Sequence, residues 1–281
     1  KAYPKSKHLQ DVYATLGIEA SVTATDAATG KTLRTYEGTG GTEEIIVSDG
    51  VIFALVNPHP VKRYQPKEPY TNVGQIKGEG RRRPLDEKPV RVTAVAADTG
   101  ETLWKSESVV LPLTLAVDAR RVYFHDGEKV VALDRESGEE QWTSEPIPRC
   151  EKIFSHFAPT LVVYEDVVLF AGGEEYIPHR GGRDTMTALS AETGKTLWTA
   201  EHPPGGYQSP EDLLVSGGLV WAGATTSGGY SGVFTGRDPK TGEVKKEFPP
   251  DVDTYWFHHR CHRAKATENY LLVSRTGIEF V

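Results

Sequence analysis

The sequence predicts an all-β fold built from repeated four-stranded sheets, a β-propeller, and three observations favour this class. The chain of 281 residues contains 28 Gly and 18 Pro beside ample Val, Thr and Tyr, a composition typical of short strands joined by turns. One short turn pattern recurs five times along the chain. No segment has a sustained 3.6-residue apolar period with helix caps, so little helix is expected.

The repeat has the form Ala-x-Asp-x-x-Thr-Gly-x-x-x-Trp in its fullest copies, and its glycines are Gly30, Gly100, Gly138, Gly194 and Gly242. The Asp carboxylate can accept hydrogen bonds from backbone N–H groups of the turn, and the Gly supplies the positive φ that a tight hairpin requires. The Trp four residues later is expected to pack between neighbouring sheets. Arg34 and Lys246 replace Trp in the first and last copies, so we expect those two seams to be looser or differently packed.

Alternating strand pairs separate the repeated turns. They are Glu43–Ser48 with Val51–Val56, Leu113–Asp118 with Arg121–His125, Leu161–Tyr164 with Val167–Ala171, and Asp212–Val215 with Leu219–Gly223. Combined with the turns, these pairs divide a single domain, 1–281, into a partial blade at 11–39, four blades and a second partial blade. The four blades are expected near 40–109, 110–146, 153–202 and 208–249, and the last partial blade at 257–281.

The partial blades predict an incomplete part of a seven- or eight-bladed ring. The N-terminal piece is expected to supply the three outer strands of a blade, and the C-terminal piece only the two innermost strands. If the last inner strand instead closed the ring by completing the N-terminal blade, its neighbour would be left as an exposed edge. We therefore expect a further polypeptide segment to complete the propeller.

An insertion at 57–89 accounts for the longest interval between repeats. It is rich in proline, lacks an apolar period and contains the basic cluster Arg81-Arg82-Arg83. Such a loop is either a lid over one propeller face or a surface excursion. The three arginines are either a solvated surface run or a patch that attracts an anionic substrate or a glycan carboxylate.

Composition excludes several classes of function. With 32 basic and 39 acidic residues the formal net charge is −7, which provides no broad positive face for a nucleic-acid backbone. No run of about 18 apolar residues is present, so no transmembrane segment is expected. The two cysteines, Cys150 and Cys261, are too few for a disulfide framework and lack the spacing of a metal knuckle.

The repeat resembles that of PQQ-like β-propellers, the family of the quinoprotein dehydrogenases and the BamB-type outer-membrane assembly lipoproteins. The stretches 251–263 and 270–281 are similar to large bacterial PQQ-like repeat proteins, some of which carry a fused methyltransferase domain. No methyltransferase is visible in these residues, so no methylation activity is carried over. The resemblance implies a periplasmic or otherwise extracytoplasmic location.

The densest group of candidate site residues follows Trp256. His258, His259, Arg260 and His262, together with His179 and Arg180 of another loop, are the candidate catalytic residues, and Trp256, Arg260 and Arg263 are candidates for binding a cofactor. On a strand, His258 and His262 would lie about 13 Å apart, so a metal would need a further ligand such as His156 or His179. The alternatives are polar packing along the propeller channel, an anion or substrate pocket, or a metal site.

The favoured functional hypothesis is a ligand-binding or protein-assembly scaffold, with a small molecule or glycan held in the channel. The enzyme alternatives are a PQQ-dependent alcohol or sugar oxidoreductase and a polysaccharide lyase, in which Arg would neutralise a uronate carboxylate while His or Tyr removes the α-proton. The resemblance implies PQQ with Ca²⁺ for the first enzyme. Alcohol-oxidising members of the family have a vicinal cysteine pair, and Cys150 and Cys261 are not vicinal.

Overall fold

The computed structural model describes eleven segments of the chain. They are residues 20–58, 82–84, 88–149, 152–154, 159–172, 175–177, 181–202, 213–223, 234–248, 265–272 and 279–280. All regular elements within these segments are β-strands, and none is a helix. The predicted all-β class is therefore confirmed.

Four antiparallel sheets form the body of the molecule. Sheet 1 has the order β3 (Thr42–Ser48), β4 (Val51–Val56), β6 (Val90–Ala96) and β7 (Thr102–Ser108), and sheet 2 the order β8 (Ala116–Val117), β9 (Arg121–His125), β10 (Val130–Asp134) and β11 (Glu140–Thr143). Sheet 3 contains β13 (Thr160–Tyr164), β14 (Val167–Ala171), β16 (Gly181–Ser190) and β17 (Thr196–His202), with β15 (Glu175–Ile177) beside β16. Sheet 4 contains β18 (Leu213–Ser216), β19 (Leu219–Gly223), β20 (Phe234–Arg237) and β21 (Val244–Phe248).

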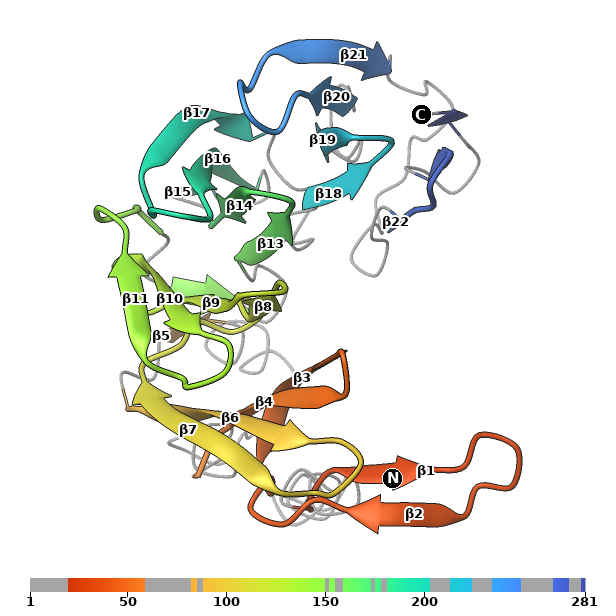
Figure 1. The fold of residues 1–281 in the computed structure, drawn as a ribbon. Helices are drawn as coiled ribbons and strands as arrows, with labels where there is room; N and C mark the ends of the chain where they lie inside the picture. The colour runs from red at the N-terminus through yellow and green to blue at the C-terminus, as the bar shows by residue number, and fades with distance from the viewer. Residues whose placement is uncertain are drawn as a thin grey trace, which may run out of the picture.

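Two smaller sheets lie at the ends of this series. The N-terminal hairpin pairs β1 (Thr23–Thr25) with β2 (Thr32–Thr35), and the C-terminal sheet joins β22 (Lys265–Ala266), β23 (Tyr270–Leu272) and β24 (Glu279–Phe280). In Figure 1 the sheets follow one another along an arc, with the first strand of each full sheet on its inner side and the last strand on its outer side. Contacts between β3 and β8, β8 and β13, β13 and β18, and β18 and β22 link the inner strands. This is the blade arrangement of a propeller.

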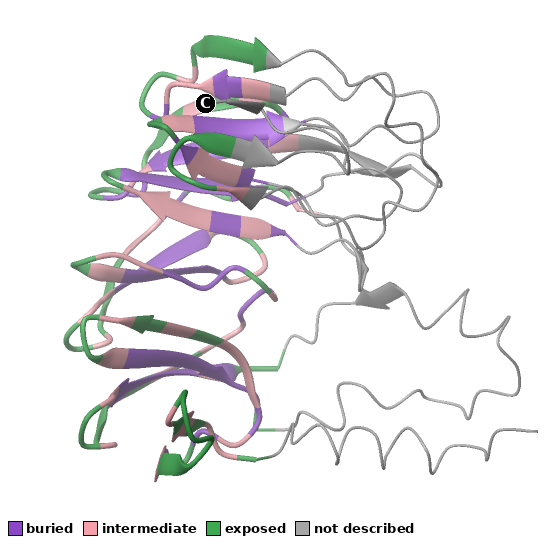
Figure 2. Ribbon diagram, turned by 90° about the vertical axis from the view of Figure 1, so that its right-hand side faces the viewer, coloured by how far each residue is buried: buried purple, intermediate pink, exposed green. Residues whose placement is uncertain are grey.

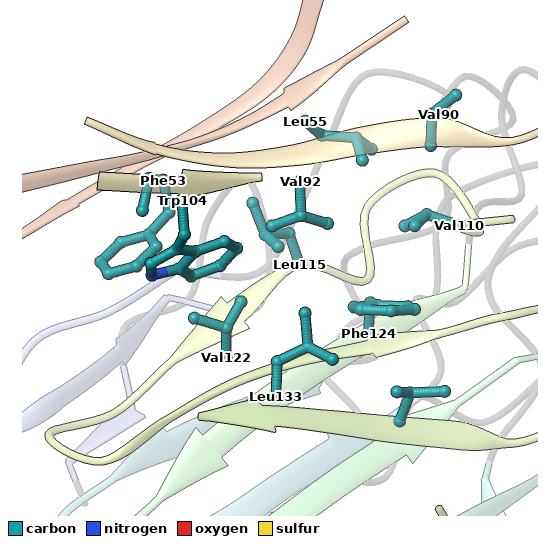
Figure 3. Close-up of a cluster of buried hydrophobic side chains, with 12 residues drawn as sticks. Phe53, Leu55, Val90, Val92, Trp104, Val110, Leu115, Val122, Phe124 and Leu133 are labelled. Atoms are coloured by element: carbon teal, nitrogen blue, oxygen red, sulfur yellow. The ribbon is translucent and has the colours of Figure 1, made fainter. Parts of the chain in front are cut away.

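The hydrophobic core lies in the seams between consecutive sheets. The first seam combines side chains of sheets 1 and 2, among them Phe53, Trp104, Val122 and Leu133 (Figure 3). Equivalent clusters join sheet 2 to sheet 3 and sheet 3 to sheet 4, and a smaller one joins the N-terminal hairpin to sheet 1. Sheets 2 and 3 bury both faces against their neighbours, so their strands are apolar on both sides, and exposed residues gather at the turn ends of the sheets (Figure 2).

The five repeat glycines all adopt the predicted positive φ, between +71° and +79°. In three of the turns an aspartate caps the backbone: Asp26, Asp134 and Asp238 each accept hydrogen bonds from the N–H groups two and three residues later. Hydrogen bonds from backbone and side chain of Ser137 lower the pKa of Asp134, with the backbone N–H as the larger cause. The turn chemistry read from the sequence is therefore confirmed.

Two regions differ from the predicted strands by more than one residue at an end. The inner strand expected at Leu113–Asp118 contains only Ala116–Val117, because Leu113 adopts a left-handed φ of +62° and the Thr114 side chain donates to the carbonyl of Leu111. The C-terminal segment forms three short strands instead of two. Its third strand, Glu279–Phe280, is too short to produce an alternating pattern in the sequence.

The insertion at 57–89 is described only at 57–58, 82–84 and 88–89. Within it, β5 (Arg82–Pro84) pairs antiparallel with β12 (Lys152–Phe154), which lies in the connection between sheets 2 and 3. The insertion therefore pairs with the connection between sheets 2 and 3 and not with sheet 1. Sequence analysis gave no indication of this pairing, since neither three-residue strand has a recognisable period.

Candidate functional site

Every site residue predicted from the sequence lies outside the described residues. These are His156, His179, Arg180, Trp256, His258, His259, Arg260, His262 and Arg263, and both cysteines, Cys150 and Cys261, also fall there.

No group of three or more His, Cys, Asp or Glu side chains in the described segments is arranged to hold a metal ion. A Ca²⁺ ion beside a bound quinone requires several oxygen ligands. The described residues contain no cluster of acidic side chains that would supply such a set. The described segments also contain no helix long and apolar enough to cross a membrane.

A tryptophan on the outer strand of each of sheets 1 to 3 contacts the repeat turn of the following sheet. The indole Nε1–H donates to a backbone carbonyl of that turn: Trp104 to Arg135 at 2.8 Å, Trp142 to Ala191 at 3.0 Å, and Trp198 to Pro239 at 2.8 Å. The same indoles lie directly on the turn glycines. A Cβ built on Gly138, Gly194 or Gly242 would lie within 2.4–2.7 Å of a ring atom.

The seam between the N-terminal hairpin and sheet 1 uses a different pair of side chains for the same contacts. Tyr36 donates its hydroxyl to the carbonyl of Ala97 at 2.8 Å, which is the position that Arg135 occupies in the next sheet. The Arg34 guanidinium donates to the Thr99 carbonyl at 2.6 Å and lies beside Gly100. Arginine and tyrosine together thus replace one tryptophan, which agrees with the expectation of a differently packed seam.

In sheet 4 the tryptophan lies on the second strand instead of the outer strand. Trp221 on β19 is fully buried, and a Cβ on Gly236 of β20, its cross-strand partner, would lie 2.7 Å from the indole. Its Nε1–H donates to Ser216 within the same sheet at 2.9 Å. Contact with the next sheet is made instead by the Ser216 hydroxyl, which donates to the carbonyl of Thr267 at 2.5 Å. Lys246, in the repeat position of the tryptophan, is exposed.

Charged side chains at the turn ends add a second contact across each of the three seams between the full sheets. Arg135, whose side chain is 10% exposed, donates to the carbonyls of Ser48 and Asp118 at 2.9 and 2.6 Å and lies 4.9 Å from the centre of the Phe53 ring. Across the seam between sheets 2 and 3, Glu192 forms ion pairs with Arg120 and Arg121. Across the seam between sheets 3 and 4, Lys240 Nζ lies 3.8 Å from carboxylate oxygens of Glu165 and Asp166. Exposed ion pairs of this kind contribute little stability each, but charged contacts recur at the same place in all three seams between the full sheets.

A buried histidine joins sheet 2 to sheet 3. His125 is inaccessible to solvent, stacks on Phe170 of β14 at 4.5 Å, and contacts the carbonyl of Ile147 through Nε2 and the N–H of Gly127 through Nδ1. The Gly127 bond requires an unprotonated Nδ1, so the ring is neutral with its proton on Nε2. Burial lowers the pKa of His125 to about 4. These contacts assign it a role in packing.

The outer strands present exposed leucines at one repeat position. Leu33 on β2, Leu103 on β7 and Leu197 on β17 each follow the turn glycine by three residues, and they are 65%, 48% and 44% exposed. The residue after each of them makes the seam contact. Strand alternation directs Trp104 and Trp198 toward the following sheet, so the leucines lie on the opposite face of their sheets, where they are exposed. The leucine position is visible in the repeat, although no role was predicted for it from the sequence.

Comparison with known proteins identifies related sequences and folds. The family model described as outer membrane protein assembly factor BamB matches residues 89–249, more than half of the chain and the whole of β6 to β21. No curated protein matches the chain.

Solved structures with a similar fold come from several functional classes. BamB from Moraxella catarrhalis is 16% identical with a TM-score of 0.47, and the alignment covers 82% of this chain and 59% of that one. The quinohemoprotein alcohol dehydrogenase from Comamonas testosteroni is 18% identical with a TM-score of 0.47, covering 77% and 36%. The Pan2 WD40 domain from Neurospora crassa is 10% identical with a TM-score of 0.44, covering 90% and 62%. The chain thus spans less than two thirds of each of these proteins.

Proposed function

Because the chain belongs to the family of the outer membrane protein assembly factor BamB and is a PQQ-like propeller repeat protein, we propose that it acts as a protein-assembly scaffold. We propose further that it acts outside the cytoplasm, beside the outer membrane. Its partner would be an outer-membrane polypeptide that has not yet folded. Such a polypeptide exposes alternating apolar side chains, because its strands face lipid on one side.

The observation that carries this proposal is the set of exposed leucines on β2, β7 and β17. Leu33, Leu103 and Leu197 occupy one repeat position on the last strands of separate sheets, and these sheets follow one another along the arc (Figure 1), so the leucines form a spaced series of apolar contacts. The seam contacts support the same role, because tryptophans packed on turn glycines hold successive sheets at a fixed spacing. A rigid series of weak apolar contacts suits an extended, unfolded partner, since multiple contacts raise avidity without one deep pocket.

Binding of an unfolded β-barrel polypeptide tests the proposal. A fluorescently labelled outer-membrane β-barrel protein, diluted from urea, is titrated with the chain and followed by anisotropy. We expect saturable binding that weakens about tenfold when Leu103→Lys and Leu197→Lys are combined, since each removes an exposed apolar contact. Gln141→Lys, at the same repeat position on β11 but without a leucine, is the matched control and should leave binding unchanged.

Two results would contradict the scaffold proposal. One is equal binding of an unfolded soluble protein of similar length. The other is unchanged binding by the double leucine variant. Dye-linked alcohol or sugar oxidation after addition of PQQ and Ca²⁺ would favour the oxidoreductase alternative, and release of unsaturated uronate absorbance from acidic polysaccharides would favour the lyase.

For either enzyme the residues to test remain those predicted from the sequence, with His258 and Arg260 first. His258→Ala and Arg260→Ala should abolish turnover while leaving the fold intact. A glycan or small ligand in the channel is a separate proposal, tested by calorimetric titration with acidic oligosaccharides.

A further inference from the structure

One carboxylate on the inner strand of sheet 1 accepts two backbone N–H groups of sheet 2. Glu44 lies on β3, and its side chain accepts the N–H of Leu113 and, at 3.2 Å, the N–H of Leu115. Both donors belong to the connection that leads from β7 into β8. The other end of β3 contacts a repeat turn, since Arg135 donates to the carbonyl of Ser48. Glu44 therefore connects sheets 1 and 2 at the end of the seam away from the repeat turns.

The backbone that donates to Glu44 is strained. Leu113 has a φ of +62°, in the left-handed region that is sterically unfavourable for a residue with a Cβ. It is 44% exposed, so it is not fixed by complete burial in the seam. The other non-glycine residues of positive φ in the described segments, Asp49 and Glu165, lie in two-residue hairpin loops, where this conformation is usual. Leu113 lies in no such loop, so another interaction must hold it.

The turn that contains Leu113 is locked by a buried threonine, and we call residues 111–114 the inner turn. Thr114 is inaccessible to solvent, and its hydroxyl donates to the carbonyl of Leu111 at 2.8 Å and accepts the N–H of His125 at 3.1 Å. The N–H of Leu111 donates to the carbonyl of His125 at 2.8 Å. These bonds join the inner turn to β9, so the hydrogen bond of the His125 amide depends on the conformation of the turn.

A turn with the same hydrogen bonds precedes the inner strand of sheet 1, and it contains glycine. In residues 36–39, the buried Thr39 donates to the carbonyl of Tyr36 at 2.6 Å and accepts the N–H of Val22 at 2.8 Å. The third residue of this turn, Gly38, has a φ of +76°, where the inner turn has Leu113. Glycine adopts this conformation without a steric cost. Only the leucine turn therefore requires a compensating interaction.

The strand that carries Glu44 also holds the first residue of the insertion at 57–89. A β-bulge lies between Thr42 and Glu44, and Glu43 is its extra residue. The Glu43 carboxylate accepts a side-chain N–H of Asn57 at 2.9 Å, and the backbone N–H of Asn57 donates to the carbonyl of Gly41 at 3.0 Å. Asn57 is 4% exposed. Two consecutive glutamates thus connect the start of the insertion and the inner turn to one bulge.

We propose that Glu44 is a clamp that holds the inner turn in its left-handed conformation, and that the bulge at Glu43 couples this clamp to the start of the insertion. A displacement of Asn57 shifts the bulge, weakens the bonds from Glu44 and lets Leu113 relax. The clamp is thus a conformational connection between the insertion and the inner end of sheet 2. It is independent of the scaffold proposal, which depends on the outer strands.

Amide hydrogen exchange tests whether Glu44 holds the inner turn. The reporter is the amide of His125, which donates to Thr114. Glu44→Ala should raise its exchange rate at least about tenfold, because the turn opens more often. In a Leu113→Gly background the same substitution should raise the rate less than about twofold, because glycine keeps the left-handed φ without a clamp. Glu140→Ala, at an exposed glutamate on β11, is the matched control and should leave the rate unchanged.

Three results would overturn the clamp. One is an unchanged rate in Glu44→Ala. Another is an equal rise with leucine and with glycine at position 113, because Glu44 would then be an ordinary hydrogen-bond acceptor. The third is an equal rise at the amide of Leu169 in sheet 3, which indicates global destabilisation. If Glu44→Ala does not fold, Glu44→Gln, which keeps one acceptor oxygen, takes its place in the same comparison.

The coupling to the insertion has its own measurement. Asn57→Ala should raise the His125 exchange rate about threefold in the wild-type background and leave it unchanged in Glu44→Ala, because the clamp is then already absent. Additive effects of the two substitutions would contradict the coupling. Binding of the unfolded β-barrel probe should be the same in all these variants, which separates the clamp from the scaffold function.

Discussion

Substitution of one turn glycine measures how much the seam tryptophan contributes to stability. Gly138 has a φ of +74°, and a Cβ on it would lie 2.5 Å from Cε3 and 2.7 Å from Cδ2 of Trp104. Gly138→Ala therefore costs about 1 kcal/mol for the left-handed backbone and a further 1–3 kcal/mol, roughly, for displacing a packed indole. We expect a loss of about 2–4 kcal/mol in the free energy of unfolding, measured by urea titration with circular dichroism.

A matched glycine separates the two contributions. Gly30 occupies the same place in the first repeat turn with a φ of +71°, and a Cβ on it would meet no atom within 4 Å. Gly30→Ala should therefore cost only the backbone part, about 1 kcal/mol. In a Trp104→Ala background, Gly138→Ala should shrink to the same value. Equal costs for the two glycines in the wild-type background would refute the idea that the indole fixes the seam.

Three further substitutions test other seam contacts, each by urea unfolding. Gly236→Ala should cost about 1–3 kcal/mol through overpacking against Trp221, although its φ is not left-handed, and Gly218→Ala should not reproduce this steric part. Arg135→Met should cost about 2 kcal/mol, because it removes the hydrogen bonds to the Ser48 and Asp118 carbonyls and the cation over Phe53 while retaining apolar volume. The folded-state pKa of His125 is about 4 against 6.5 in the unfolded chain. Its contribution is therefore complete above pH 6.5 and falls by roughly 2–3 kcal/mol at pH 4.5, and His125→Gln should remove that part of the pH dependence.

Local chemistry explains which parts of the fold could be predicted from the sequence. The strands β4, β9, β14 and β19 have the predicted boundaries, because each is bounded by a turn and carries a run of apolar residues. The β5–β12 pair was not predictable, since pairing between residues 82–84 and 152–154 depends on tertiary contacts. The strand at β8 was predicted too long, at Leu113–Asp118, because no residue type in its sequence requires the left-handed Leu113. In the structure, the carboxylate of Glu44 on β3 accepts the backbone N–H groups of Leu113 and Leu115.

The candidate site could be predicted less well than the fold, for a related reason. The repeat identifies positions whose roles recur in every sheet, such as the turn glycine and the seam tryptophan. Residues such as His258 and Arg260 belong to no repeat, so their neighbours cannot be read from the period. The exposed leucines are intermediate: their repeat position is visible in the sequence, but the direction of Leu103 follows only once Trp104 is known to face the seam.

The substitutions at the two outer seams show that the repeat conserves contacts more strictly than residue types. In the three seams between full sheets, a turn carbonyl accepts an indole N–H. In the seam between the N-terminal hairpin and sheet 1, the equivalent carbonyl accepts the Tyr36 hydroxyl. The small residue on the third strand becomes Gly236 where the tryptophan moves to the second strand. In both places a change at the seam position is accompanied by a second change nearby that restores burial or the hydrogen bond.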